Sequence, residues 1–554
     1  MIKKQQFSRV IILVICLFVS ETYAQDVKRA RPKEWNGLVE GSRFIDRFLP
    51  IPVIGEKKSD TWGAKQVVPR YVDNGIEEKD WSYWGGNIIQ DEEGKYHQYI
   101  CRWREDSEKG HMAWPQSEVA HVIGNNLLGP FKYVETIGKG HNPEIYKIKD
   151  GRYVISVNGG YYLSKSLNGP WEYSKFEYDQ REKPILDHLT NNTFAQREDG
   201  SYLMVSRGGE VFFSESGLPP FYMVTDKSNY PPYDGRYEDP VIWRTNIQYH
   251  MIVNDWLGRI AYYLRSKDGI HWKLDAGEAY LPGIVKYEDK TLEDWYKFER
   301  IKMFQDKYGR AIQANFAVAD TIKKQDRGSD NHSSKNIGIP LTIGKLITVL
   351  NTEKLTANTQ EIRLKVQAEK GFNPHKHINF KSLRFGASET VNFGGGSKVI
   401  KKEKAGNDLI LTFEGKGNGL TEDNFAGKLL GKTRKGKLLF GFAQLPEINY
   451  LEQALSSKYP VLELNGRNLK VSLEVQNFGQ VNSIKTPVEI QYKKEGKWQS
   501  LAKGVITVLK PFEKTIIQMH AKKFAEIGEV ANTRVIISQK GQKTSTLEGK
   551  VIVR

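Results

Sequence analysis

The sequence predicts an all-β protein in which a five-bladed β-propeller precedes two C-terminal β-sandwich domains. Two observations lead to this prediction. A unit of roughly 50 residues recurs along the first part of the chain, and each unit combines short strand-like runs with tight turns. After residue 350 the pattern changes to runs in which apolar and polar residues alternate. Short strands repeated at this period are typical of propeller blades, and sustained alternation is typical of sandwiches.

The repeated unit opens with a strand that begins at a polar residue and continues into an apolar run. The five strand starts are Asn87, Asn142, Asn192, Asp239 and Glu299. Tight turns come next, in segments 93–96, 150–153, 199–202 and 308–310. Four units close on an aromatic residue: Phe131, Trp171, Phe221 and Trp272. Five first strands predict five blades, which we assign to residues 25–350.

The first 24 residues have the pattern of a bacterial secretory signal peptide. Lys3, Lys4 and Arg9 precede an apolar run over residues 10–19, and we expect cleavage after Ala24. A membrane anchor is disfavoured because the run is about half of the ~20 residues that a spanning helix needs. We therefore expect a secreted or periplasmic bacterial protein with no membrane span in its mature form.

Two further domains are predicted after the propeller. Residues 351–464 are expected to form a β-sandwich. Residues 465–554 are expected to form an immunoglobulin-like β-sandwich, because the segment from Leu469 to Val475 alternates regularly. Neither domain contains an evident cluster of titratable residues, so we expect both to be accessory domains.

The chain is basic, with a formal net charge of +16 from 82 Lys and Arg against 66 Asp and Glu. A basic secreted protein suits an anionic partner, but no nucleic-acid-binding motif accompanies this charge. We therefore expect no nucleic-acid partner. An anionic oligosaccharide or polysaccharide is the more specific interpretation, and a solvated basic surface is the simpler one.

In a propeller the first strand of every blade lines the central channel, so the strand starts should meet at one mouth. Glycoside cleavage needs one carboxylic acid to protonate the leaving oxygen and a second carboxylate as base or nucleophile. We predict Asp239 and Glu299 as this pair. Side chains alternate along a strand, so only one of Glu238 and Asp239 should face the channel, with Glu238 bracing Asp239. The residues predicted to bind substrate are Trp84, Asn87, Asn142, Asn192, Arg207, Asp255 and Arg300.

Simpler interpretations of these residues stay open at this point. The polar strand starts could form a mutually hydrogen-bonded plug on the axis, with water or a cation. Glu299 and Arg300 could form a structural ion pair, and Trp84 could be a core residue. No cofactor is expected to be required, since no metal-binding Cys/His spacing is present, but a structural cation in the channel is compatible with the pattern.

The Glu238-Asp239-Pro240 strand, the Asp-Gly turns and the Gly-Pro-Trp closing segment resemble five-bladed propeller glycosidases of glycoside hydrolase families 43 and 117 and their marine polysaccharide-degrading relatives. The resemblance covers about residues 40–350. It implies an exo-acting glycoside hydrolase that releases sugars from plant or algal oligosaccharides, including sulfated or otherwise anionic ones.

The chain departs from the family 43 pattern, in which the first blade carries an aspartate as base. Asn87 stands on the first blade and Asn142 on the second, so the family's residue roles are not transferred to this chain. Relatives that release anhydro-galactose use a histidine as acid, which makes His141 a candidate. Asp80 and Asp255 are candidate substitutes for the missing base.

Two other functions are compatible with the same sequence. A glycan-binding propeller without catalysis would explain the missing aspartates. A glycoside phosphorylase would need an anion pocket, for which Arg207 and Arg300 are the candidates.

Overall fold

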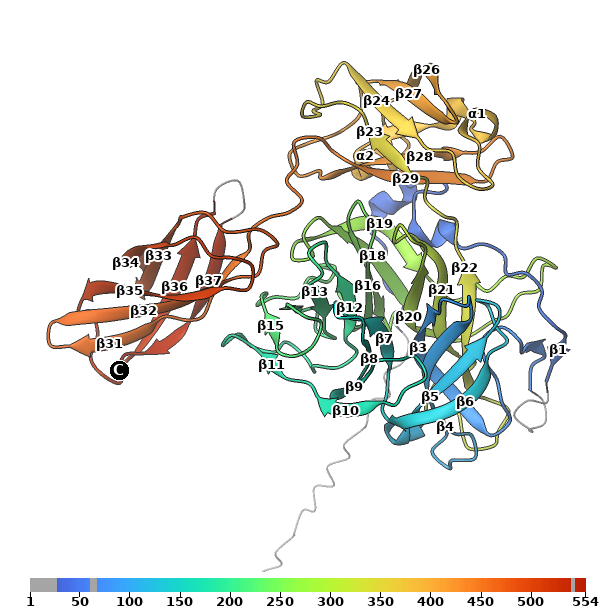
Figure 1. Cartoon of the computed structure of the whole chain (residues 1–554), viewed down its shortest axis with the longest axis horizontal. Helices are drawn as coiled ribbons and strands as arrows, with labels where there is room; N and C mark the ends of the chain where they lie inside the picture. Colours follow the sequence, from blue (N-terminus) through green and yellow to red (C-terminus); the bar gives the residue numbers. More distant parts are fainter. Residues whose placement is uncertain (1–26, 60–66, 540–543) are drawn as a thin grey trace, which may run out of the picture.

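The structure is a computed structural model that describes residues 27–59, 67–539 and 544–554. The predicted signal peptide ends before the described residues begin. The described chain is nearly all β, and its sheets are almost entirely antiparallel. Figure 1 shows a ring of sheets formed by residues 81–340, a middle unit over residues 347–444 and a last unit over residues 455–552. None of the helices in these described segments is long and apolar enough to cross a membrane.

Residues 81–340 form five sheets in chain order. The first holds β3 (Trp81–Gln90), β4 (Tyr96–Arg104), β5 (Glu118–Gly124) and β6 (Lys132–Lys139). The second holds β7 (Glu144–Lys147), β8 (Tyr153–Val157), β9 (Gly160–Ser164) and β10 (Glu172–Lys175). The third holds β12 (Thr193–Gln196), β13 (Tyr202–Val205), β14 (Val211–Ser214), β15 (Phe221–Met223) and, parallel to β15, β11 (Tyr178–Asp179). The fourth holds β16 (Tyr237–Arg244), β17 (Tyr249–Asp255), β18 (Ile260–Ser266) and β19 (Trp272–Tyr280), and the fifth holds β20 (Lys297–Gln305), β21 (Ala311–Ala319) and β22 (Ser334–Pro340).

Hydrogen bonds from side chains join each sheet to the next around a closed circuit. In four links a side chain on the inner strand of one sheet contacts main-chain atoms of the next sheet, and in the fifth the side chain comes from β22. The links are Asn87 with the main chain of Ile145, Glu144 with Phe194 N, Thr193 with Ile242 N, Asp239 with Arg300 N, and Asn336 with Gly85 O. We call this arrangement the five-sheet ring. Its inner strands are β3, β7, β12, β16 and β20.

Apolar packing between neighbouring sheets stabilises the five-sheet ring. Trp243 and Tyr263 of the fourth sheet share one buried cluster with Phe298 and Phe316 of the fifth. Burying one such side chain contributes about 1.5–3 kcal/mol. A large aromatic core therefore holds the fourth and fifth sheets together, in addition to the hydrogen bonds of their strand starts.

Residues before β3 complete the edge of the fifth sheet, next to short strands β1 (Lys57–Lys58) and β2 (Arg70–Tyr71). Ile76 forms an antiparallel bridge with Asn336 on β22. Phe48 forms another antiparallel bridge with Leu341, just beyond β22. The N-terminal segment thus covers an edge that would otherwise expose unpaired backbone groups.

The middle unit has its own apolar core between two sheets. One sheet holds β23 (Ile347–Val349), β24 (Glu361–Val366), β27 (Asp408–Glu414) and β26 (Val399–Ala405). The other holds β25 (Arg384–Gly386), β28 (Ala426–Lys432) and β29 (Leu438–Gln444), with the short helices α1 (Pro374–His377) and α2 (Ser388–Val391) nearby. Asn392 and Lys428 of this unit contact the buried carboxylate of Asp275 on β19.

The last unit also encloses its own core between two sheets. One holds β30 (Leu455–Ser457), β31 (Val461–Asn465), β32 (Asn468–Asn477) and β35 (Lys514–Lys522). The other holds β34 (Lys497–Ile506), β33 (Thr486–Lys494), β36 (Val530–Ile537) and β37 (Ser545–Ile552). Its strands begin at Leu455, upstream of the predicted boundary at residue 465, because β30 and β31 both pair with β32.

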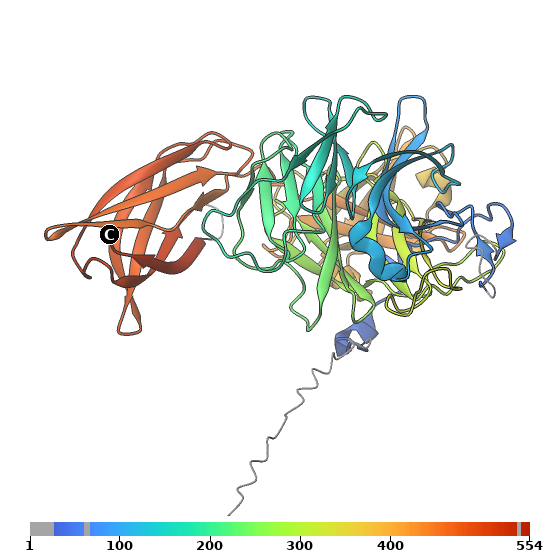
Figure 2. The ribbon, with the colours of Figure 1, turned by 90° about the horizontal axis from the view of Figure 1, so that it is seen from below.

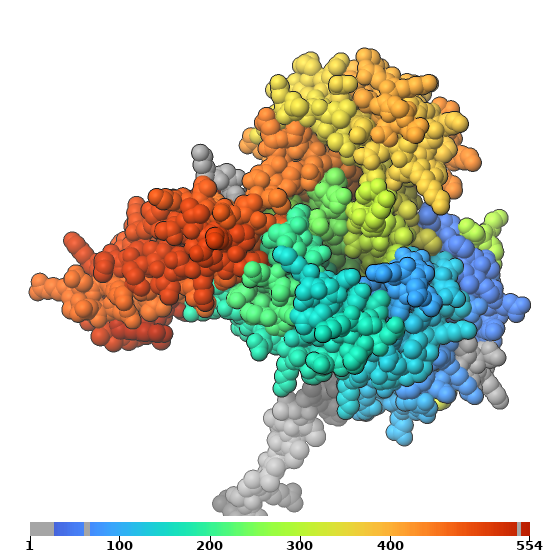
Figure 3. All heavy atoms as spheres, in the orientation of Figure 1, coloured from blue at the N-terminus to red at the C-terminus, as the bar shows by residue number. Residues whose placement is uncertain are grey.

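The last unit extends from one side of the five-sheet ring (Figures 2 and 3). Arg181, on the loop after β11, is 1% exposed and donates to Gln476 over 2.9 Å. The fully buried ring of Phe478 belongs to an apolar cluster formed mainly by the third and fourth sheets. Charged and apolar contacts therefore both attach this unit to the ring.

Candidate active site

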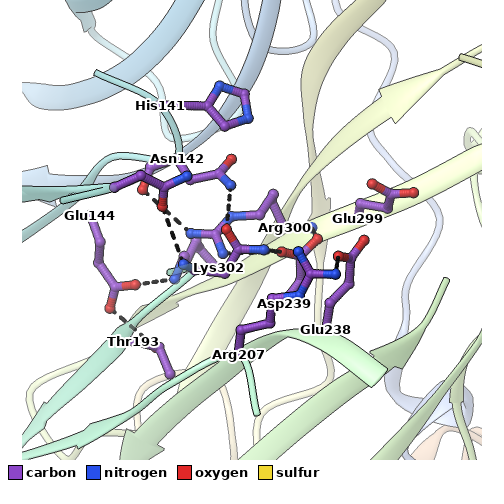
Figure 4. A network of polar contacts seen from close by, with 12 residues as sticks. His141, Asn142, Glu144, Thr193, Arg207, Glu238, Asp239, Glu299, Arg300 and Lys302 are labelled. Atoms are coloured by element: carbon purple, nitrogen blue, oxygen red, sulfur yellow. Dashed lines mark hydrogen bonds and ion pairs between the residues drawn. The ribbon is translucent and has the colours of Figure 1, made fainter. Parts of the chain in front are cut away.

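Three carboxylates meet at the starts of two neighbouring inner strands. Glu238 and Asp239 lie on β16 and Glu299 lies on β20 (Figure 4). One oxygen of each carboxylate lies within 4.8 Å of an oxygen of the other two. The prediction that Glu238 and Asp239 point in opposite directions is therefore wrong.

A bulge explains why successive side chains converge. The pairing between β16 and β17 shifts register between Glu238 and Val241, and Asp239 has a positive φ of 55°. The same irregularity recurs on β20, where the register shifts between Glu299 and Lys302. A bulge interrupts the regular alternation of side chains and redirects them, as often occurs next to functional sites.

Asp239 is fully engaged by its neighbours. Its Oδ1 accepts hydrogen bonds from Asn191 Nδ2 at 2.8 Å and from Arg300 Nη1 at 3.1 Å. Its Oδ2 accepts from the main-chain N–H of Arg300 at 3.2 Å. Asn191 in turn accepts from Asn142 Nδ2 at 2.7 Å, which extends the network to the second sheet. Asp239 and Arg300 are both buried. Together with Asn191 and Asn142 they form a hydrogen-bonded layer that we call the floor of the site.

The other two carboxylates have half-buried cationic partners. Lys323, on the loop between β21 and β22, contacts Glu299 Oε2. Arg207, on the loop after β13, has its Nη2 3.4 Å from Glu238 Oε2. The second oxygen of Glu299 is buried without a hydrogen-bond partner. Glu299 therefore keeps one acceptor available for a water or a substrate.

The surroundings favour the protonated form of Glu238. Burial, followed by the negative charges of Asp239 and Glu299, raises the pKa of Glu238 to about 8. Burial lowers the pKa of Lys323, but Glu299 and Glu238 outweigh it and leave a net increase. At neutral pH the site thus holds a protonated carboxylic acid close to other carboxylates, which is the pattern expected for acid–base catalysis.

His141 lies above Arg300 in the view of Figure 4 and is partly exposed. Its Nδ1 is 3.0 Å from Ser117 Oγ, and its ring centre is 4.7 Å from that of the exposed Trp114. Burial, followed by the charges of Arg300 and Lys323, lowers the pKa of His141 to about 3. The imidazole is therefore neutral at physiological pH.

Beneath the floor, the inner strands surround a polar cavity of about 260 Å³. Glu144 on β7 forms a buried ion pair with Lys302 on β20 and accepts from Thr193 Oγ1 at 3.2 Å. Burial lowers the pKa of Lys302 to about 8. Asn142, Asn191, Asp239 and Arg300 form a hydrogen-bonded layer between this cavity and the carboxylates of Glu238 and Glu299.

Some of the residues predicted to bind substrate contact groups outside the carboxylate cluster. Asn87 binds both main-chain groups of Ile145. Asn192 donates to Tyr178 Oη at 2.9 Å rather than to the carboxylates. Asp255 forms an ion pair with Arg29 at 2.6 Å. Trp84 is 2% exposed, but the ammonium group of Lys323 lies 4.6 Å from the centre of its ring.

Two residues of the site were not predicted. Asn191, rather than its neighbour Asn192, contacts Asp239, and its φ of 54° places it outside a regular strand. Lys323 lies in a polar loop whose residues carry no pattern that distinguishes a site from a solvated surface. The alternative of an ion pair between Glu299 and Arg300 is not what the structure shows, because Arg300 pairs with Asp239.

The three carboxylates are close enough to one another to bind a single cation. However, Arg207, Arg300 and Lys323 already contact them. A divalent ion would be placed close to three positive side chains, which repel it. The three positive side chains therefore disfavour a divalent ion at this cluster.

No protein-family model and no curated protein matches the chain. Among solved structures, the chain is similar to the α-L-arabinofuranosidase of Lactobacillus brevis, with 13% identity over 47% of this chain and 90% of that chain and a TM-score of 0.33. It is also similar to a GH43 protein of Bacillus licheniformis, with 11% identity over 85% of this chain and 89% of that chain and a TM-score of 0.31. A third similar structure is a sialidase, with 10% identity over 96% of this chain and 49% of that chain and a TM-score of 0.30. At these TM-scores the description of the fold rests on the sheets of this chain alone.

Proposed function

We propose that this protein is an exo-acting glycoside hydrolase built on a five-bladed β-propeller, with two C-terminal β-sandwich domains and a site of action outside the cytoplasm. The convergence of Glu238, Asp239 and Glu299 from two neighbouring sheets is the observation that carries the proposal. The closed five-sheet ring supports the propeller, and the N-terminal sequence pattern supports secretion.

The different partners of the three carboxylates suggest their roles. Glu238 is the general acid, because its raised pKa keeps a proton available for the leaving oxygen at neutral pH. Glu299 is the second carboxylate, which acts as base or nucleophile through its unpaired Oε1. Asp239 is a positioning residue, because Arg300 and Asn191 occupy both of its oxygens. The roles of the two adjacent carboxylates are thus exchanged relative to the sequence-based hypothesis.

Two features of the site bear on the substrate. The floor formed by Asn142, Asn191, Asp239 and Arg300 lies between the other two carboxylates and the cavity beneath them, which suits a chain end better than a threaded chain. Arg207 and Lys323 are half-buried cations beside the carboxylates, which suits a sulfated or carboxylated sugar. Plant or algal oligosaccharides with such ends are therefore the proposed substrates.

Turnover of oligosaccharides from plant and algal cell walls, with and without phosphate, tests this function. We expect hydrolysis that does not depend on phosphate, and a rate about 10²- to 10⁴-fold lower for Glu238→Gln and for Glu299→Gln. Glu135→Gln, which changes a half-exposed carboxylate on β6, should behave as the wild type. NMR of the first-formed anomer separates a base role for Glu299 from a nucleophile role. Unchanged rates in both site variants would exclude these roles, and turnover only with phosphate would indicate a phosphorylase.

A glycan-binding protein without catalysis is the second candidate. Lys323 covers Glu299, which is only 2% exposed, and such a closed carboxylate suits binding better than attack. Saturable binding of an oligosaccharide that is never cleaved, even at high protein concentration, would favour this candidate.

A further inference from the structure

The hydrogen-bond partners of His141 Nδ1 bear on which of the two ring nitrogens carries the proton. The thiol of Cys101 donates to the main-chain oxygen of Trp84 at 2.9 Å. Burial raises the pKa of Cys101 to about 12, so the thiol keeps its hydrogen at every physiological pH. The Sγ atom, 3.5 Å from His141 Nδ1, therefore presents only lone pairs to the imidazole.

Ser117 supplies the second neighbour of Nδ1. Its hydroxyl oxygen lies 3.1 Å from the main-chain oxygen of Gly140, and we assign its single hydrogen to a bond with that oxygen. The Oγ atom can then only accept from His141 Nδ1, which is 3.0 Å away. With this assignment both atoms that face Nδ1 are acceptors, which favours a proton on Nδ1 and a free lone pair on Nε2.

The groups beyond the ring keep this state in place. Arg300 and Lys323 lie close enough for their positive charges to oppose protonation of the imidazole. Arg300 and Lys323 are hydrogen-bond donors and not acceptors. The neutral imidazole of His141 therefore supplies a hydrogen-bond acceptor beside them. The exposed indole of Trp114 stands beside the imidazole, at a tilt of 41°, and supplies an apolar wall. A partly exposed acceptor next to an aromatic wall suits a sugar ring, which offers hydroxyl donors and C–H faces.

We propose that His141 is a specificity residue that accepts a hydrogen bond, through Nε2, from a hydroxyl group of the bound sugar. The proposal rests on the proposed function for the identity of the ligand, and it excludes His141 as the catalytic acid. It also implies that different residues recognise different substituents of the sugar. Arg207 and Lys323 attract acidic groups. His141 disfavours them, because its lone pair repels a carboxylate or sulfate oxygen.

Nitrogen-15 NMR of the histidine-labelled protein tests the protonation state without any ligand. The resonances of residue 141 are identified by their loss in His141→Gln. We expect a neutral ring with the proton on Nδ1 that does not titrate between pH 5 and pH 8. A proton on Nε2, or a titration within this range, would overturn the proposal.

The same spectra test binding when L-arabinose, D-xylose, D-galactose and D-glucuronate are each added in large excess. We expect a neutral sugar to shift the Nε2 resonance, and the Nε2 resonance to respond less to any sugar in Trp114→Ala. If none of the four sugars shifts it, the proposal is wrong. A shift without turnover of any oligosaccharide would refute the glycosidase function and leave the role of His141 standing.

Kinetics on a hydrolysed oligosaccharide give a second, independent measurement. His141→Asn can replace the Nδ1 contact with Ser117 but has no atom near the Nε2 position, whereas His141→Gln can place an amide oxygen there. Loss of one neutral hydrogen bond predicts a value of kcat/KM about tenfold lower for His141→Asn. His141→Gln should recover most of that loss, mainly through KM. Equal values in the two variants and the wild type would refute the proposal while leaving the hydrolase function intact.

Discussion

Replacing Arg207 by glutamine should move the alkaline limb of the pH–rate profile to higher pH. Arg207 Nη2 lies 3.4 Å from Glu238 Oε2, and its positive charge favours the ionised carboxylate. Without it, the protonated acid persists to higher pH than the present pKa of about 8 allows. If Glu238 is the general acid, kcat/KM should be retained at pH values where the wild type has lost it.

The geometry sets the size of this shift. At 3.4 Å, two unit charges interact by about 5 kcal/mol at an effective dielectric constant of 20 and by about 1 kcal/mol in water. These energies correspond to a pKa change between about 1 and 3.5. Arg207 is 30% exposed and also contacts Asp187 at 3.1 Å, so the aqueous limit is the better guide. We expect a shift of about one pH unit.

The assay is kcat/KM between pH 5 and pH 10 on the oligosaccharide that is hydrolysed best. Arg207→Lys is the matched control, because it keeps the positive charge and should leave the alkaline limb within a few tenths of a unit of the wild type. An unmoved limb in Arg207→Gln, or a limb that moves to lower pH, would show that another group is the acid.

Three further predictions follow from the same contacts. Asp239→Asn should reduce the free energy of unfolding by about 3–5 kcal/mol in urea titrations, because it leaves the buried Arg300 without its counter-charge, and a loss below 1 kcal/mol would contradict the fixed floor. Burial lowers the pKa of His141 to about 3, so below pH 6.5 the unfolded chain takes up a proton that the folded chain does not. Between pH 6 and pH 4 the wild type should therefore lose about 1.4 kcal/mol per pH unit more than His141→Gln, and parallel curves would argue against a buried neutral imidazole. On an anionic oligosaccharide, kcat/KM should fall as salt rises from 0.05 to 0.5 M, whereas a flat response would indicate a neutral substrate.

The spacing of the polar strand starts located the inner strands because each unit repeats the same turn and apolar run. It could not give side-chain directions at the strand starts. Asp239 and Arg300 adopt positive φ values in bulges, and the rule of alternation fails there. Likewise, the residue that contacts Asp239 is Asn191, one position before the predicted Asn192. Asn192 contacts Tyr178.

Residues contributed by irregular segments were the least predictable part of the site. Lys323 approaches Glu299 from a loop that follows no periodic pattern. The position of such a side chain depends on long-range packing, which a sequence of polar residues does not encode locally. The last unit also begins upstream of the predicted boundary at residue 465, because the short strands β30 and β31 pair with β32.

The pairing of Phe48 with Leu341, described above as covering an open edge, also bears on how this chain reaches its native state. The residues that come first during synthesis find their partners only when the last strand of the ring has been made. Contacts of such wide sequence separation slow folding, because a long loop must close before they form. The edge of the fifth sheet therefore stays open until Leu341 has been synthesised, so closing it is a late step in the assembly of the five-sheet ring.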